Sequence, residues 1–180
     1  MKPPRIQLEL VPPPKISTEF YTVGLDLSLA STGIVVIDKD GDINLQRTVG
    51  YSLKEDASER ESIERQMYIA TSVIDAMKAL PERPRVVIEG YAFSKRSSSV
   101  TKLAELRGVV KSQIWLVFQV CADIVTVGEA RRVVLGKGNT AKSSVVGILR
   151  ARGLTIGNND IADAYVVAEC LRRKKQIAER

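Results

Sequence analysis

The sequence predicts an α/β fold in which helices flank a central mixed sheet of five strands. Two observations support this prediction. Five short runs rich in β-branched residues are bounded by turn residues, which is typical of strands, and four longer segments carry apolar residues at helical spacing. The predicted strands cover residues 23–27, 33–37, 43–49, 85–89 and 123–127, and the predicted helices cover about 58–80, 100–120, 142–152 and 161–177.

The order of these elements predicts how the sheet is connected. Short turns separate the first three strands, so we expect an antiparallel meander. The helix over residues 58–80 then returns the chain to the sheet as a right-handed crossover, which places the strand at 85–89 parallel to the first strand. The apolar positions at helical spacing in this crossover are Ile63, Met67, Ala70, Ile74 and Met77.

The length of the chain and the distribution of proline predict one domain with an N-terminal arm. A chain of 180 residues is long enough to bury a core and short enough to form a single domain. Five of the seven prolines lie within residues 1–20. We therefore expect residues 1–20 to form a flexible, proline-rich arm and residues 21–180 to form the folded domain.

The composition excludes several classes of protein. The apolar runs are too short to span a membrane, and the first residues lack the apolar centre of a secretory signal. Two cysteines and no histidine argue against a disulfide framework and against a zinc site. We expect a soluble, intracellular (cytoplasmic) protein whose chemistry uses carboxylates, hydroxyls, lysine or arginine.

Positive charge is concentrated in the second half of the chain. Residues 1–90 carry 11 Lys and Arg against 14 Asp and Glu, whereas residues 91–180 carry 16 against 7, so the two halves have net charges of −3 and +9. Basic residues interleaved with Ser, Thr, Gly and Asn are typical of a phosphate-binding surface. A solvated face without a partner is the alternative.

Four carboxylates are candidates for a shared metal site. Asp26 lies within an apolar run, Glu89 ends a β-branched run, and Asp160 and Asp163 open the last predicted helix. An acid at a buried strand loses solvation, so it needs a cation or several donors to stay ionised. The spacing of three residues places Asp160 and Asp163 on one helical face.

Two of the four acids also have a structural interpretation. Asp160 could cap its helix, because Asp is favoured at that position. Glu89 could be an ordinary charged residue at the end of a strand. Asp26 is harder to explain in this way, because apolar residues bracket it.

Five segments together resemble the RuvC-like Holliday junction resolvases of the RNase H-like superfamily, over roughly residues 21–172. They are Gly24-Leu-Asp26 with Ser28 and Gly33, Val87-Ile-Glu89, Lys102-Leu-Ala-Glu-Leu-Arg-Gly108, Gly136-Lys-Gly-Asn-Thr-Ala-Lys142, and Asp160-Ile-Ala-Asp163-Ala164. The order of the four acids, with the Leu-x-x-x-Arg-Gly segment between them, carries most of the resemblance.

This resemblance implies an RNase H-like fold, a homodimer and a catalytic site. Its catalytic acids would be Asp26, Glu89, Asp160 and Asp163, binding two divalent cations, with Lys142 in contact with the scissile region. The aromatic wedge that the family carries after the second acid corresponds in position to Ala92, which Tyr91 and Phe93 flank.

The expected activity is metal-dependent cleavage of four-way (Holliday) DNA junctions by paired nicks, in recombination and repair. Two cations can supply the activated water and the charge stabilisation that phosphodiester hydrolysis needs. Oxygen ligands favour Mg²⁺, with Mn²⁺ as a substitute. The residues expected to contact DNA are Tyr91, Phe93, Lys95, Arg96, Arg131, Arg132 and Lys142.

Two other functions are compatible with the sequence. The chain could instead be a nucleotide-binding protein of the actin-like ATPase superfamily, or a non-catalytic module that binds branched DNA. For the homodimer, the second predicted helix is the candidate interface, although some of its apolar residues would pack on the sheet. The interface candidates are Leu103, Leu106, Val110 and Trp115.

Overall fold

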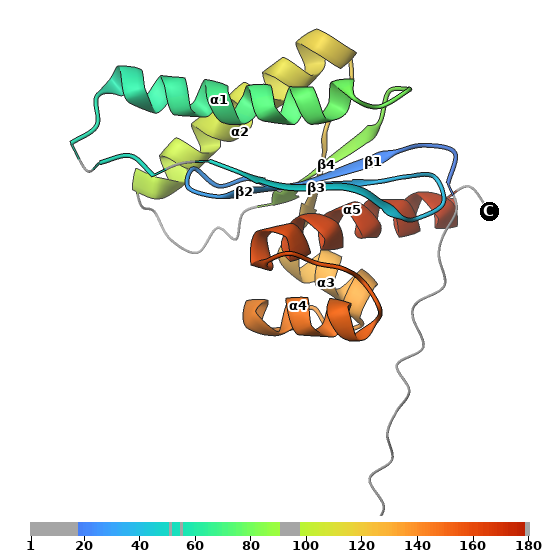
Figure 1. The fold of residues 1–180 in the computed structure, drawn as a ribbon. Helices are drawn as coiled ribbons and strands as arrows, with labels where there is room; N and C mark the ends of the chain where they lie inside the picture. Colours follow the sequence, from blue (N-terminus) through green and yellow to red (C-terminus); the bar gives the residue numbers. More distant parts are fainter. Residues whose placement is uncertain (1–17, 51, 55, 91–97, 179–180) are drawn as a thin grey trace, which may run out of the picture.

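A computed structural model describes residues 18–50, 52–54, 56–90 and 98–178, and it arranges them in layers around one sheet. Helices α1 (Glu59–Lys78) and α2 (Ser98–Phe118) cover one face of the sheet. Helix α5 (Asn159–Ala178) covers the other face, and α3 (Val127–Leu135) and α4 (Lys142–Ala151) pack on α5 (Figure 1). The predicted arm lies almost entirely outside the described residues.

The sheet has five strands in the order β3-β2-β1-β4-β5, and it is mixed as predicted. Strands β1, β2 and β3 form the antiparallel meander, whereas β4 and β5 continue the sheet in parallel to β1. The strands are β1 (Thr22–Asp26), β2 (Thr32–Ile37), β3 (Ile43–Val49), β4 (Arg85–Gly90) and β5 (Asp123–Thr126). The α/β fold class is therefore confirmed.

The central strands are apolar because helices cover both of their faces. All six residues of β2 are buried, with Val35 and Ile37 facing α5 and Ile34 and Val36 facing α1. A strand buried on both faces reads as a continuous apolar run rather than as an alternating one. This explains why β-branched runs predicted these strands well.

Helix α3 was missed by the sequence analysis. The strand predicted over residues 123–127 ends at Thr126, and the following residues form a helix. Thr126 caps this helix by accepting a hydrogen bond from the backbone N–H of Glu129. The Thr-x-x-Glu pattern is a helix-start signal, but the β-branched Val125, Val127 and Val133 concealed it.

Helix α1 is buried over a shorter length than its apolar spacing predicted. It starts at a capping box between Ser58 and Glu61 and ends before Pro81. Ala70, Ile74 and Met77 are buried as expected, whereas Ile63 is 51% exposed and Met67 is 41% exposed. Burial begins only at Gln66, whose side chain donates to Glu105 of α2.

The interface hypothesis for α2 needs correction. Leu106 and Val110 are fully buried against α1 and the sheet, and Leu103 packs partly against the same cluster, so they belong to the core of one chain. Trp115 remains 47% exposed, and its neighbours Leu116 and Val117 are exposed as well. The exposed apolar surface of α2 therefore lies near its carboxyl end.

Helix α5 lies directly on the backbone of β1 and β2. A Cβ atom at Gly24 would stand 2.1 Å from the carbonyl oxygen of Ala164, and one at Gly33 would stand 2.2 Å from that of Asp160. Glycine is thus required where each strand meets the helix. This contact places the first turn of α5 beside the carboxyl end of β1.

Replacing Gly24 with alanine should therefore destabilise the protein. The added methyl group meets backbone atoms that have no room to move, and overpacking of this kind costs about 1–3 kcal/mol. Gly147→Ala in α4 is the control, because its Cβ meets nothing within 4 Å and helical alanine is favoured over glycine by roughly 0.5–1 kcal/mol. Urea unfolding measures both changes, and equal stability of the two variants would refute the close contact.

Candidate active site

Three carboxylates meet at one edge of the sheet. Asp26 is the last residue of β1, Glu89 lies near the end of β4, and Asp163 lies in the first turns of α5. Because β1 and β4 are parallel neighbours, their carboxyl ends are adjacent. One oxygen from each of the three carboxylates lies within 4.8 Å of the others. This arrangement is that of a candidate metal site built from oxygen ligands.

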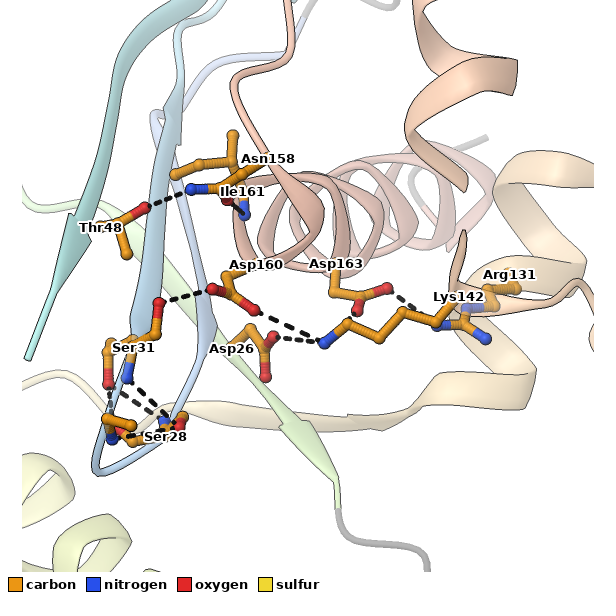
Figure 2. A network of polar contacts seen from close by, with 12 residues as sticks. Asp26, Ser28, Ser31, Thr48, Arg131, Lys142, Asn158, Asp160, Ile161 and Asp163 are labelled. Atoms are coloured by element: carbon orange, nitrogen blue, oxygen red, sulfur yellow. Dashed lines mark hydrogen bonds and ion pairs between the residues drawn. The ribbon is translucent and has the colours of Figure 1, made fainter. Parts of the chain in front are cut away.

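Lys142 supplies a positive charge to the same cluster. It is the first residue of α4, and its Nζ lies 3.0 Å from Asp163, 3.6 Å from Asp26 and 3.6 Å from Asp160. Figure 2 shows its side chain reaching toward the three aspartates. Burial alone would lower the pKa of Lys142, but the aspartates outweigh that effect and raise it. The ammonium of Lys142 thus lies among the three aspartates and partly balances their negative charge.

Burial and mutual repulsion make two of the acids hard to ionise. Desolvation raises the pKa of Asp26 to about 6, with Asp163 and Asp160 adding to the shift and Lys142 opposing it. Desolvation raises the pKa of Glu89 to about 8, and the charges of Asp26 and Asp163 add to it. One ammonium therefore does not neutralise the cluster, and a divalent cation fits these residues better.

Asp160 lies beside the three-carboxylate cluster and has its own partner. The hydroxyl of Ser31, in the turn between β1 and β2, donates to Asp160 Oδ2 at 2.5 Å (Figure 2). Asp160 is not the cap of α5. Asn158 fills that role, because its side-chain oxygen accepts from the backbone N–H of Ile161 at 2.9 Å. Asp160 is therefore available to the site.

Arg131 holds Asp163 in place. Arg131 is 9% exposed, and its guanidinium lies 2.9 Å from Asp163 Oδ1 and donates to the carbonyl oxygen of Thr140 at 2.7 Å. It thereby joins α3, α5 and the segment that leads into Lys142. The sequence analysis assigned Arg131 to DNA phosphates, but its guanidinium is engaged inside the fold. Its exposed neighbour Arg132 is open to solvent.

Arg107 holds the strand that carries Glu89. It lies in α2, within the Leu-x-x-x-Arg-Gly segment, and its guanidinium donates to the backbone carbonyl of Glu89. The Leu-x-x-x-Arg-Gly pattern by itself indicated no physical role for this arginine. Four other predicted DNA contacts, Tyr91, Phe93, Lys95 and Arg96, lie outside the described residues.

The raised pKa values predict that the metal-free protein loses stability as the pH rises. The ordinary values are 3.8 for Asp26 and 4.5 for Glu89, against about 6 and about 8 in the fold. The folded state therefore binds more protons than the unfolded state from about pH 4 to pH 8, so the free energy of unfolding falls across this window.

Urea unfolding in the presence of a chelator at pH 6, 7 and 8 tests this expectation. No histidine complicates the interval, because the chain has none. Glu89→Gln should flatten the upper part of the profile, from pH 6 to pH 8. A wild-type protein whose stability is level or rises over that range would contradict the account.

Comparisons with known proteins identify the fold. No protein-family model matches the chain, and no curated protein matches it in sequence. Solved structures do match it. RuvC of Thermus thermophilus is 20% identical, with a TM-score of 0.71 over 88% of this chain and 96% of that one.

Two further structures agree with this match. T. thermophilus RuvC in complex with a Holliday junction substrate is 17% identical, with a TM-score of 0.75 over 89% of this chain and 97% of that one. The yeast mitochondrial Holliday junction resolvase Ydc2 is 10% identical, with a TM-score of 0.57 over 91% and 82%. The chain therefore shares the fold of these RuvC and Ydc2 structures, an α/β fold of the RNase H-like class.

Proposed function

We propose that this protein is a metal-dependent endonuclease that resolves four-way DNA junctions by paired phosphodiester nicks. The observation that carries the proposal is the cluster of Asp26, Glu89 and Asp163 at the carboxyl ends of β1 and β4. The fold supports it, because solved structures of junction-resolving proteins match nearly the whole chain.

The cluster suits two divalent cations of the Mg²⁺ or Mn²⁺ type. Asp26 is central and would bridge them, Glu89 would hold one, and Asp160 or Asp163 would hold the other. When bound, such ions activate water and stabilise charge on the phosphate oxygens. Ser31 and Arg131 orient Asp160 and Asp163 for this role.

Lys142 has two roles in this proposal. Without metal, its ammonium offsets the repulsion among the aspartates. If cations were held by these oxygens, Lys142 would no longer be needed to offset the aspartates, and its ammonium would contact the phosphate at the scissile bond. Lys142 is half-exposed, which leaves it room to turn outward.

The proposed assembly is a homodimer. Paired nicks in a symmetric junction require two sites related by a two-fold axis. Helices α1 and α2 pack together and leave large apolar side chains exposed, which makes them the proposed interface. These side chains are Ile63, Met67, Tyr68, Trp115, Leu116 and Val117.

The alternatives have less support. A nucleotide-binding protein of the actin-like type needs two domains of this kind, whereas the described residues form one sheet. A non-catalytic module would bury several carboxylates at a cost that Lys142 and Arg131 offset only in part. No helix among the described residues has the length and apolar character needed to cross a membrane.

Asp26→Asn should abolish nicking while junction binding persists. A neutral amide holds a cation poorly, and removal of one negative charge reduces repulsion of DNA, so we expect a loss of roughly a hundredfold or more in the single-turnover rate. Asp75→Asn, an exposed acid on α1, is the matched control and should cut normally. Gel assays with a labelled four-way junction measure both properties. Near-normal cutting by Asp26→Asn would disprove the site.

Leu116→Glu should convert the protein from dimer to monomer. Leu116 is 67% exposed on the proposed interface, and a charge there would be buried without a partner. Ile124→Glu, on the edge strand β5, makes the same change at a 46% exposed residue away from that surface. Sedimentation at micromolar concentration gives the masses. A monomeric wild type, with or without DNA, would count against paired nicking.

A further inference from the structure

A basic hollow lies on the α1 and α2 side of the sheet, away from α5. It has a volume of about 290 Å³ and forms where the chain after β3 meets the first turns of α1 and α2. We call it the basic hollow, and its lining residues are Leu53, Lys54, Ala57, Ser62, Arg65 and Lys102.

The charge of the basic hollow is one-sided. Three of its lining residues are cationic, and none of the described residues that line it is acidic. The acids that precede Ser62 and Arg65 in the sequence, Glu61 and Glu64, bond to Ser58 and Arg60. This is notable because residues 1–90 carry a net charge of −3. The three cations come from three separate segments, so no single basic run marks them in the sequence.

Arg65 has an unused donor within this group. Its Nε is buried, and among the described residues no acceptor lies within hydrogen-bond distance of it. A buried N–H group without a partner is costly, so an acceptor brought by a ligand would be favoured there. Ser62 adds a hydroxyl on the same side, one turn earlier in α1. Together these groups suit a phosphate oxygen, which accepts several charge-assisted hydrogen bonds.

The topology places the basic hollow at the same edge of the sheet as the acid cluster, which is formed by Asp26, Glu89 and Asp163. Strand β3 runs parallel to β1, since both are antiparallel to β2, so its carboxyl end lies at the edge that carries Asp26. Lys54 follows that end of β3, and Lys102 lies in the first turns of the helix that follows β4. In Figure 1, the amino ends of α1, α2 and α5 all lie at this side of the molecule.

We propose that the basic hollow binds a backbone phosphate of the DNA substrate. A DNA strand that lies across the edge of the sheet would then be bound at two places. The acid cluster would bind it on the α5 side, and the basic hollow would bind it on the α1 and α2 side. Phosphate contacts position DNA without reading its sequence, which suits an enzyme that selects branched structure. The inference rests on the proposed function and adds a second contact outside the cleavage site.

The test is the salt dependence of junction binding in a metal-free buffer, where cleavage does not interfere. Each neutralised phosphate of duplex DNA contributes a slope of about 0.9 in the plot of log affinity against log salt. The variant Arg65→Gln/Lys102→Gln should lower the slope by about 0.9 and weaken binding roughly tenfold at ~0.1 M salt. Arg65→Lys keeps the charge and should retain the slope.

The matched control removes two charges at the opposite edge of the sheet. Lys78 and Arg83 are exposed at the carboxyl end of α1 and in the segment before β4. Lys78→Gln/Arg83→Gln should change the slope by less than half as much. Thermal unfolding of every variant must match that of wild type, which shows that binding rather than folding changes.

The outcomes separate this inference from the proposed function. If wild type binds and cuts the junction but the Arg65 and Lys102 variant keeps the wild-type slope, the basic hollow is not a phosphate site. The same conclusion holds if the control variant lowers the slope equally. If wild type neither binds nor cuts a four-way junction, the proposed function fails, and the basic hollow has no DNA to bind.

Discussion

The contact between the backbone of α5 and the glycines of β1 and β2 is the constraint on which the site depends. Gly24 and Gly33 let the helix approach until its carbonyl oxygens occupy the space that side chains would fill. That close approach places Asp160 and Asp163 beside Asp26. The acids would not come together by themselves. Like charges repel, so the packing energy of the buried helix must hold them together.

The electrostatic consequence is a site that is incomplete without added positive charge. The raised pKa values of Asp26 and Glu89 record the cost of placing carboxylates in a buried edge beside one another. Lys142 offsets part of this cost beside Asp26 and Asp163, and Arg131 does so beside Asp163. The remaining deficit is what a divalent cation would satisfy, so the same repulsion that strains the metal-free fold favours metal binding.

Much of the fold could be predicted from sequence, because its strongest signals are local. Strands buried on both faces produce β-branched runs, and the crossover rule alone placed Glu89 beside Asp26. Helix α3 was missed because its β-branched residues favour strands, whereas packing against α5 stabilises them in a helix. The burial predicted for the start of α1 was wrong. The spacing of apolar residues indicates which face of a helix is buried, but it does not indicate how much of the length of that face a neighbouring element covers.

The partners of the acids could not be predicted. Ser31 and Asp160 are 129 positions apart, and Arg131 and Asp163 are 32 apart, so neither pair leaves a local pattern. In the sequence, Arg131 resembles the other basic residues of the second half of the chain, and its buried ion pair with Asp163 is visible only in the fold. The most direct test is cleavage of a synthetic four-way junction, compared with a linear duplex of the same sequence, with Mg²⁺ and with a chelator. The account predicts nicks at symmetric positions in two opposing strands of the junction, only with the metal. An intact junction at every Mg²⁺ concentration, or equal cutting of the duplex, would contradict it.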